Sequence, residues 1–404
     1  MSDVRSRQGA GPDRSPSRPI AAGAGEWQDL VVVVAANNWS GTKLHDRHVA
    51  ERLTTFAPVL YVDPPLSHVM ARADPVLTAA VHEPRLRIVA PRIARLTPVV
   101  LPFPLRAGMQ RVTDRLVRRA LRRAVAALAA TPAAVLSGAP MLGVFGVCGE
   151  RRSVYWAQDD YAALADRGGP SAARVRAAEQ QRTAEADVIV AANPQTEARL
   201  RSSGRPVVLV PYGCDAALFA GVDDAPWPAD VDLPPPIAGF VGHLNFRTDP
   251  SLLEAVADRG VSVLLVGPRS PDLDIQSLLT RPNVAWVGPK PFADLPSYQR
   301  AIDVGLVPYT HCAFNEASFP LKTLEYLAAG RPVVSTDLPA TRWLDTCLVA
   351  VADDPASFAG AVERLANEPR SPAAVAARRR FAARHSWEVR ARQLAEVLGV
   401  GGGR

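Results

Sequence analysis

The sequence predicts an α/β protein built from two doubly wound parallel sheets. Three observations predict this class. Short apolar runs alternate with amphipathic helical patterns along most of the chain. The alternation stops at residues 211–236, where proline and aspartate cluster as in a linker, and it restarts at residue 237. The length of 404 residues fits two or three domains of about 150 residues each.

The first half begins with a continuous β-branched run at residues 30–36, which is typical of a strand covered on both faces. Helical periodicity follows this run and recurs between later apolar runs, and such strand–helix–strand repeats give parallel pairs. We expect further strands at residues 58–62, 86–90, 133–136, 153–157, 188–192 and 207–210, with helices near residues 43–56, 106–130, 171–186 and 195–203.

The second half repeats this rhythm. We expect strands at residues 237–241, 261–266, 284–287, 303–307, 332–335 and 347–351, and closing helices at residues 358–366, 373–384 and 387–398. The chain thus divides into a disordered tail (1–26), a first domain (27–210), a linker (211–236), a second domain (237–384) and a C-terminal helical segment (385–404). Because open α/β sheets bind ligands beyond the carboxyl ends of their strands, the functional residues should follow strands.

Composition excludes several classes of protein. Hydrophobic residues make up 48% and charged residues 21%, as in a globular chain, and the net charge is +6. The four cysteines are scattered and form no C-x-x-C pair, which argues against a zinc or redox motif and fits a reducing compartment. No G-x-G-x-x-G follows the first strand and no Walker loop is present, so a nicotinamide dehydrogenase is not indicated.

Two stretches bear on membranes. The tail lacks the apolar segment of a signal peptide. Residues 124–149 carry no charge, but proline and glycine interrupt them, so we expect a helix end, a short strand and a glycine-rich connection.

The segment from Phe314 to Ser335 is the most informative part of the sequence. Pro320 suits a first helical turn and Gly330 suits a helix end. A helix start attracts phosphate, and Lys322 places a cation there, where the helix dipole disfavours one unless an anion binds nearby. Glu325, one turn further, suits hydrogen bonds from ribose hydroxyls. The alternative is an ordinary surface Lys–Glu pair three residues apart.

The run P-x-K-x-x-E-Y-L-A-A-G-R-P-V-V at residues 320–334 resembles the donor-binding motif of bacterial group 1 (family 4) glycosyltransferases of GT-B fold, and is most similar to their teichuronic-acid-type branch. Other segments resemble the same family in the same order: V-P-Y-G-C-D with Phe219, G-F-V-G at 239–242, N-V-A-W-V-G at 283–288, L-P-S-Y at 295–298, D-V-G-L-V-P at 303–308 and S-W-E at 386–388. The resemblance is strong from residue 210 to 400 and weak before it. It implies two Rossmann-like domains that face a central cleft, with the last helix crossing back to the first domain.

The resemblance also implies roles for individual residues. The second domain would bind a nucleoside-diphosphate sugar. Glu325 would hold the ribose, and Lys322 with the backbone of Thr323 and Leu324 would hold the diphosphate. Gly242 would allow close approach to the phosphates, and the loop that begins at Gly288 would lie near the base.

The chain departs from the family pattern at several positions. His243 stands where the family often has arginine, and Arg247 stands one residue before the position of the family's lysine; we expect both to contact phosphate. The family often carries an acid eight residues before the position of Glu325. Here that position is Ala317, so Glu316 and Asn315 are the candidates for contact with the transferred sugar.

The first half offers two candidate catalytic residues. Asp159 follows a predicted strand and would contact the transferred sugar, while the alternative is that Asp159 or Asp160 caps a helix. His45 would act as general base if the reaction inverts configuration, although an ordinary helix-start role is the alternative. His48 we interpret as structural or exposed.

The helix near residues 106–130 is strongly basic. Residues 106–123 include seven arginines and one acid, and an apolar stripe runs along the same helix. The arginine stripe fits contact with an anionic membrane or a plain solvated face, and nucleic acid is not indicated. The family resemblance implies that this part of the first domain meets membrane-bound acceptors. The stripe consists of Arg111, Arg115, Arg118 and Arg122.

These observations favour a cytoplasmic enzyme, peripheral on the inner membrane face if the basic helix binds lipid. We expect it to move a sugar from a nucleoside-diphosphate sugar to a polysaccharide or lipid-linked acceptor of the cell envelope, with the retention of configuration that the resemblance implies. No D-x-D cluster suited to Mg²⁺ is evident, so we expect no metal or other cofactor. The alternatives are a non-catalytic binder of sugar nucleotides and a transferase acting on small natural products.

Overall fold

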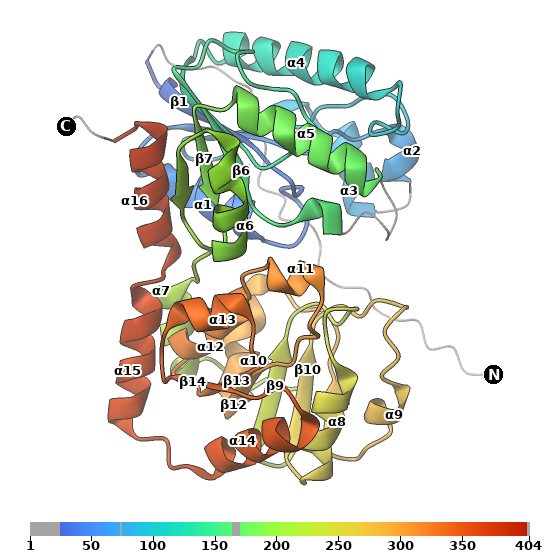
Figure 1. The fold of residues 1–404 in the computed structure, drawn as a ribbon, viewed down its shortest axis with the longest axis vertical. Coiled ribbons are helices and arrows are strands. Elements are labelled where there is room, and N and C mark those ends of the chain that lie inside the picture. The colour runs from blue at the N-terminus through green and yellow to red at the C-terminus, as the bar shows by residue number, and fades with distance from the viewer. Residues whose placement is uncertain (1–24, 73–74, 164–169, 402–404) are drawn as a thin grey trace. The chain divides into compact units, whose positions relative to one another are not determined.

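A computed structural model of the chain describes residues 25–72, 75–163 and 170–401 (Figure 1). The chain separates into two compact units, Met1–Arg152 and Ser153–Arg404. Within the described residues the strands form two sheets, and almost every strand pair is parallel. The predicted fold class, with two Rossmann-like sheets, is therefore confirmed.

The first sheet has the strand order β3-β4-β2-β1-β5-β6-β7-β8. Its strands are β1 (Gln28–Val34), β2 (Val59–Val62), β3 (Leu86–Ala90), β4 (Ile93–Leu96), β5 (Thr131–Ser137), β6 (Arg152–Ala157), β7 (Val188–Ala191) and β8 (Val207–Leu209). The helices between them are α1 (His45–Leu53), α2 (His68–Ala71), α3 (Pro75–His82), α4 (Gln110–Ala127), α5 (Ala172–Glu185) and α6 (Pro194–Leu200).

One strand of this sheet departs from the prediction. The sequence did not indicate β4, which pairs with β3 in the antiparallel direction. Only two residues separate these strands, and so short a connection permits only a hairpin. The short helices α2 and α3 were also missed. The uncharged residues 124–149 contain the end of α4, strand β5 and a loop, as predicted, and no helix among the described residues could cross a membrane.

The second sheet has the order β11-β10-β9-β12-β13-β14 and is parallel throughout its described pairs. Its strands are β9 (Ile237–Val241), β10 (Ser262–Val266), β11 (Val284–Trp286), β12 (Val304–Val307), β13 (Val333–Ser335) and β14 (Val349–Val351). Strand order reverses between β9 and β12, because β10 lies on one side of β9 and β12 on the other. Such a switch point is where open α/β sheets bind their ligands.

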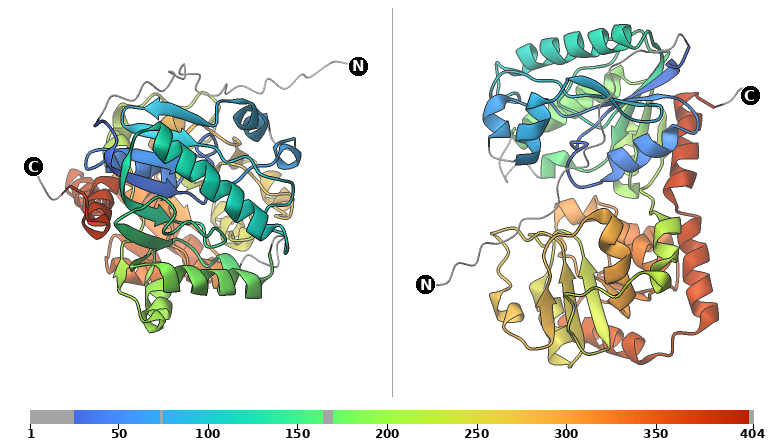
Figure 2. Two further views of the ribbon diagram at one scale, coloured as in Figure 1. Left: turned by 90° about the horizontal axis from the view of Figure 1, so that it is seen from above. Right: turned by 180° about the vertical axis from the view of Figure 1, so that it is seen from behind.

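Helices cover both faces of the second sheet (Figure 2). One layer contains α8 (Pro250–Asp258) and α14 (Pro355–Asn367), which pack on each other, and the other contains α7 (Ala216–Ala220), α12 (Leu321–Ala328) and α15 (Pro372–Ala383). The remaining helices are α9 (Gln276–Leu279), α10 (Leu295–Ala301), α11 (Ala313–Glu316), α13 (Pro339–Leu344) and α16 (Trp387–Leu398). The predicted linker at 211–236 thus contains a helix, α7.

Two features fix α12 against the sheet at the switch point. A Cβ at Gly305 in β12 would lie 2.3 Å from the Tyr326 ring, so the missing side chain leaves room for this helix residue. The Tyr326 hydroxyl accepts a hydrogen bond from the Val241 amide at the end of β9 (2.8 Å). The start of α12 is therefore held beside the carboxyl ends of β9 and β12.

Candidate functional site

The start of α12 leaves backbone donors open. Pro320 is the N-cap residue and no side chain caps the helix. The first amides of a helix have no partner within it. The Thr323 amide already donates to the Pro320 carbonyl (3.2 Å), so the amides of Leu321 and Lys322, rather than that of Thr323, remain for a ligand. The Thr323 hydroxyl is buried and has no hydrogen-bond partner, while the Leu324 side chain belongs to the core.

Lys322 is a buried cation in the first turn of this helix. Its side chain is only 7% exposed, and its Nζ lies 3.6 Å from the centroid of the Phe240 ring and 4.7 Å from that of Tyr309. Among the described residues it forms no ion pair with a carboxylate. Burial lowers the pKa of Lys322 below its ordinary value. An unpaired buried charge is costly, and a bound anion at this position would compensate it.

Gly242 makes room for this lysine. Its φ is +152°, and a Cβ there would lie 2.6 Å from the Lys322 Nζ. Gly267 follows β10 with φ +136°, and a Cβ there would lie 2.1 Å from the Gly242 carbonyl oxygen. The Gly267 amide in turn donates to the carbonyl of Gly288 after β11 (2.9 Å). The loops after three neighbouring strands are thus packed backbone against backbone, which only glycine permits cheaply.

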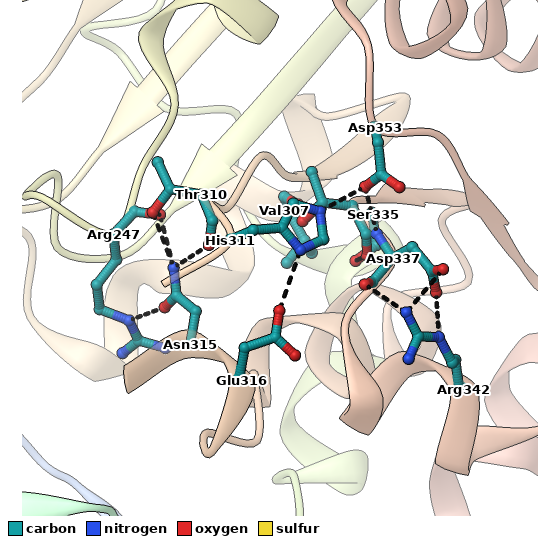
Figure 3. A network of polar contacts seen from close by, with 11 residues as sticks. Arg247, Val307, Thr310, His311, Asn315, Glu316, Ser335, Asp337, Arg342 and Asp353 are labelled. Atoms are coloured by element: carbon teal, nitrogen blue, oxygen red, sulfur yellow. Dashed lines mark hydrogen bonds and ion pairs between the residues drawn. The ribbon is translucent and has the colours of Figure 1, made fainter. Parts of the chain in front are cut away.

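Arg247 and Asn315 hold each other in place (Figure 3). The Arg247 Nε donates to the Asn315 Oδ1 (2.7 Å) and an Nη to the Ser318 hydroxyl (3.1 Å). The Asn315 side chain is fully buried and donates to the carbonyls of Arg247 (3.0 Å) and Thr310 (2.8 Å). Asn315, which the sequence marked as a sugar contact, therefore positions the loop and the arginine.

Glu316 is oriented by a histidine that the sequence did not single out. The Nδ1 of His311 lies 3.1 Å from a Glu316 oxygen, and its Nε2 lies 2.9 Å from Asp353 (Figure 3). Hydrogen bonds to Asp353 and Glu316 raise the pKa of His311. Asp353 also accepts from the amide of Asp337, which pairs with Arg342. These bonds connect the loop after β12 to the ends of β13 and β14.

Glu325 has no hydrogen-bond partner for its carboxylate among the described residues. Burial, with a smaller contribution from the nearby Asp215 charge, raises its pKa to about 7, although Lys322 opposes the shift. A carboxylate with open acceptor positions fits donors such as ribose hydroxyls. Its role at the ribose stays a prediction.

His243 is exposed, and its Nε2 lies 2.9 Å from the Ser270 hydroxyl. Desolvation and the Lys322 charge lower its pKa, so the ring is neutral near pH 7 and offers a polar contact rather than a charge.

Tyr309 and Phe240 are site residues that the sequence analysis missed. Tyr309 follows Pro308 directly after β12, at the switch point, so its position after a strand was the available signal. Phe240 is a strand residue, and no sequence pattern shows that its ring lies beneath a lysine.

In the first unit, His45 lies at the start of α1 and is buried. Its Nε2 is 3.7 Å from an oxygen of Asp46 and 3.4 Å from the side-chain nitrogen of Asn37. Asp46 also accepts from the Asn37 side chain (2.7 Å) and backbone (3.1 Å). His48 is buried rather than exposed, and desolvation with neighbouring positive charges lowers its pKa to about 2.

The structure separates the roles of Asp159 and Asp160. An oxygen of Asp160 accepts hydrogen bonds from the amides of Ala162 (3.1 Å) and Ala163 (3.3 Å). Asp160 therefore caps the short helical turn at residues 161–163. An oxygen of Asp159 lies 3.5 Å from the Tyr212 hydroxyl.

The arginine stripe lies on the outer face of α4. Arg111, Arg115, Arg118 and Arg122 are exposed, whereas Val117 and Leu121 belong to the core beneath the helix. The two stripes read from the sequence thus occupy a solvent face and a packed face.

Comparison with known proteins identifies the class of the second half. Residues 235–368, which extend from just before β9 to the end of α14, match the family model of glycosyl transferases group 1. This segment contains Gly242, Lys322 and Glu325. The resemblance read from the sequence is confirmed.

A curated relative makes the match more specific. Over 171 residues the chain is 33% identical to TuaH of Bacillus subtilis (strain 168), a protein named as a teichuronic acid biosynthesis glycosyltransferase. This match covers 41% of the chain and 43% of TuaH, so it spans less than half of the relative.

Solved structures agree on the fold. A sucrose-phosphate synthase from Thermosynechococcus elongatus aligns with a TM-score of 0.69 at 17% identity, over 92% of this chain and 98% of that one. HepE from Anabaena, in complex with UDP and glucose, aligns with a TM-score of 0.63 at 13% identity, over 92% and 99%. At such identities these likenesses show the GT-B fold.

Proposed function

We propose that the protein transfers a sugar from a nucleoside-diphosphate sugar to a glycan or lipid-linked acceptor of the bacterial cell envelope. The observation that carries this proposal is Lys322, a buried ammonium that forms no ion pair with a carboxylate among the described residues and stands at a helix start that no side chain caps. Both features attract a diphosphate. The family match over this segment, the relative named for teichuronic acid biosynthesis, and the UDP and glucose bound by HepE support the same donor class.

The proposed mechanism follows from these groups. As the sugar leaves, negative charge develops on the diphosphate, and the Lys322 ammonium with the amides of Leu321 and Lys322 stabilises it. Arg247 is preoriented by Asn315 and Ser318 and adds a second cation. Glu325 accepts hydrogen bonds from the ribose. We expect transfer with retention and without a metal ion, with Asp159 at the transferred sugar and His45 as the candidate base should configuration invert.

The proposal is tested in two steps. A thermal-shift panel of nucleoside-diphosphate sugars identifies the donor, since a ligand at 100 times its Kd adds about 2.7 kcal/mol of stability. Release of nucleoside diphosphate with that donor is then measured with and without envelope glycan acceptors. Acceptor-dependent release supports the proposal. Binding without release under any acceptor would favour a non-catalytic binder, and failure of every donor to bind would contradict the site itself.

The exposed arginine face of α4 supports a lipid-linked acceptor, because each basic residue near an anionic surface contributes about 1 kcal/mol to binding. We expect the chain to float with vesicles of anionic phospholipid. The triple variant Arg115→Glu, Arg118→Glu, Arg122→Glu should lose this binding, while neutral vesicles serve as the control. Unchanged flotation would remove the support for a membrane acceptor and favour a small soluble one.

A further inference from the structure

The Tyr309 ring lies close to two cations of the site. Its centroid is 4.7 Å from the Lys322 Nζ and 4.7 Å from the Arg247 Cζ. Phe240 lies against the lysine at 3.6 Å, and Phe314 lies against the arginine at 4.9 Å. Three aromatic rings thus accompany two cations at the carboxyl edge of the second sheet.

This arrangement solves a physical problem. Two cations that meet one diphosphate must be close together, yet they repel each other before the ligand arrives. The faces of an aromatic ring are electron-rich and attract cations. Tyr309 is itself only 5% exposed, so its ring cannot move aside without displacing the surrounding core.

We propose that Tyr309 is a positioning residue that holds the Lys322 ammonium and the Arg247 guanidinium at the separation at which both contact one diphosphate. This inference rests on the proposed donor site and adds to it the residue that spaces its cations. It also explains how a lysine without a carboxylate partner remains charged in a buried place.

The charges around the ring support this role. Burial by itself raises the pKa of Tyr309, but Lys322 and Arg247 outweigh it, so that its pKa lies below the ordinary value. In return, the Tyr309 hydroxyl opposes the lowering of the Lys322 pKa that burial causes, through electrostatic attraction and a hydrogen bond. The other charged groups that act on the lysine are Glu325, which favours the ammonium, and Arg247, which disfavours it. The neighbouring His243 has its own pKa lowered by Lys322.

The test uses inorganic pyrophosphate and the full chain, with binding measured by calorimetry. Tyr309→Leu removes the ring and should weaken binding about tenfold, as expected for a desolvated cation–π contact. Tyr309→Phe keeps the ring and should stay within about threefold of the native protein. Tyr298→Leu is the matched control, because Tyr298 also lies beneath a lysine (Lys290 Nζ at 5.2 Å) but outside the helix start. It should bind pyrophosphate normally.

A pH series provides a readout that a merely structural residue would not move. Pyrophosphate binding that depends on the ammonium weakens as pH rises through the pKa of Lys322. Without Tyr309 this pKa is lower, so the decline in Tyr309→Leu should begin at lower pH than in the native protein. Tyr309→Phe, which lacks only the hydroxyl, should show a smaller shift in the same direction. Because the ligand is common to all variants, its own titration cancels in the comparison.

The outcomes separate this inference from the proposed function. If Lys322→Met loses binding while Tyr309→Leu binds like the native protein, the positioning role is wrong and the donor site stands. If Lys322→Met also binds normally, the donor site itself is wrong. Should Tyr309→Leu fail to fold, Tyr309→Met, which also removes the ring, decides: pyrophosphate affinity equal to that of the native protein would overturn the inference.

Discussion

Lys322 and Lys290 form the same kind of contact with opposite electrostatic outcomes. Each ammonium lies over a tyrosine ring in the second sheet's domain, Lys322 over Tyr309 and Lys290 over Tyr298. Lys290 also pairs with Asp230 (2.5 Å). Its pKa is raised by this partner although partial burial opposes the shift, whereas burial lowers that of Lys322.

The two lysines differ in whether a carboxylate of the chain pairs with the ammonium. Lys290 has its carboxylate and adds only the small stability of a partly exposed pair. Lys43, the third lysine of the chain, likewise pairs with Glu51 (2.6 Å). Among the described residues Lys322 is the lysine without an anionic partner. It is also the most buried lysine, and its ammonium lies against the Phe240 ring. A buried cation without a carboxylate partner indicates a binding site for an anion.

The largest expected effect comes from exchanging each lysine for methionine, which has a similar length but no charge. Lys322→Met should weaken binding of the nucleoside diphosphate about 100-fold, since it removes a charge-assisted contact from a buried site. Its free energy of unfolding should stay level or rise, because an unpaired buried charge disappears. Lys290→Met should leave the Kd within about twofold. Calorimetry and denaturant unfolding check both variants, and equal losses of affinity would abolish the distinction between the lysines.

Gly242 offers the next largest effect. Gly242→Ala places a Cβ 2.6 Å from the Lys322 Nζ at a φ of +152°, so the ammonium must leave its position. We expect binding of the nucleoside diphosphate to fall about tenfold, comparable to the loss of one positioned charged contact. Gly260→Ala is the matched control, because Gly260 also has a positive φ (+79°) but open space around its Cβ. It should lose stability through backbone strain yet keep its affinity; loss of affinity in both variants would point to general strain.

The sequence allowed the site's charged groups to be predicted, because their spacing along one short helix is a local property. Lys322, Glu325 and the Gly242 turn could be named from the motif. Tyr309 and His311 could not, because their roles depend on which segments lie side by side after folding. The same limit applies to Asn315: its type suggested a sugar contact, but its direction, toward Arg247, follows from the packing of two loops.

The fold could be predicted to a similar extent: both sheets were expected and one strand was missed. Runs of buried strands gave both sheets, since a strand covered on two faces has a strong sequence pattern. Strand β4, which lies between β3 and β2, was missed because it is short, contains Arg95 and is separated from β3 by only two residues. Asp160 and Asp159 show the limit of capping rules, since adjacent aspartates satisfy the same pattern and only the observed hydrogen bonds distinguish them.

Glu325, the acid one turn beyond Lys322 on the same helix, should make the stability of the folded protein depend on pH. Its pKa of about 7 lies above the ordinary value of 4.5, so the folded state binds this proton more tightly than the unfolded chain does. Stability should therefore decline as pH rises from about 4.5 to about 7, by on the order of 3 kcal/mol. Glu325→Gln should remove this decline when unfolding is measured at pH 5 and pH 8. A decline that persists in the variant would mean that another group titrates.

The smallest effect is expected at His311, a cation of the neighbouring loop that has two carboxylates instead of none. Its bonds to Asp353 and Glu316 raise its pKa, so the stability they add is complete below the unfolded pKa and is lost as pH rises through the folded one. Because all three side chains are largely exposed, solvent screens the pairs, and His311→Gln should cost well below about 1 kcal/mol at pH 6 and almost nothing at pH 9. Pyrophosphate affinity should change less than about twofold, in contrast to Lys322→Met. A loss of affinity as large as that of Lys322→Met would show that a cation already paired with carboxylates also binds the ligand. The presence or absence of a carboxylate partner would then no longer indicate which cation binds the anion.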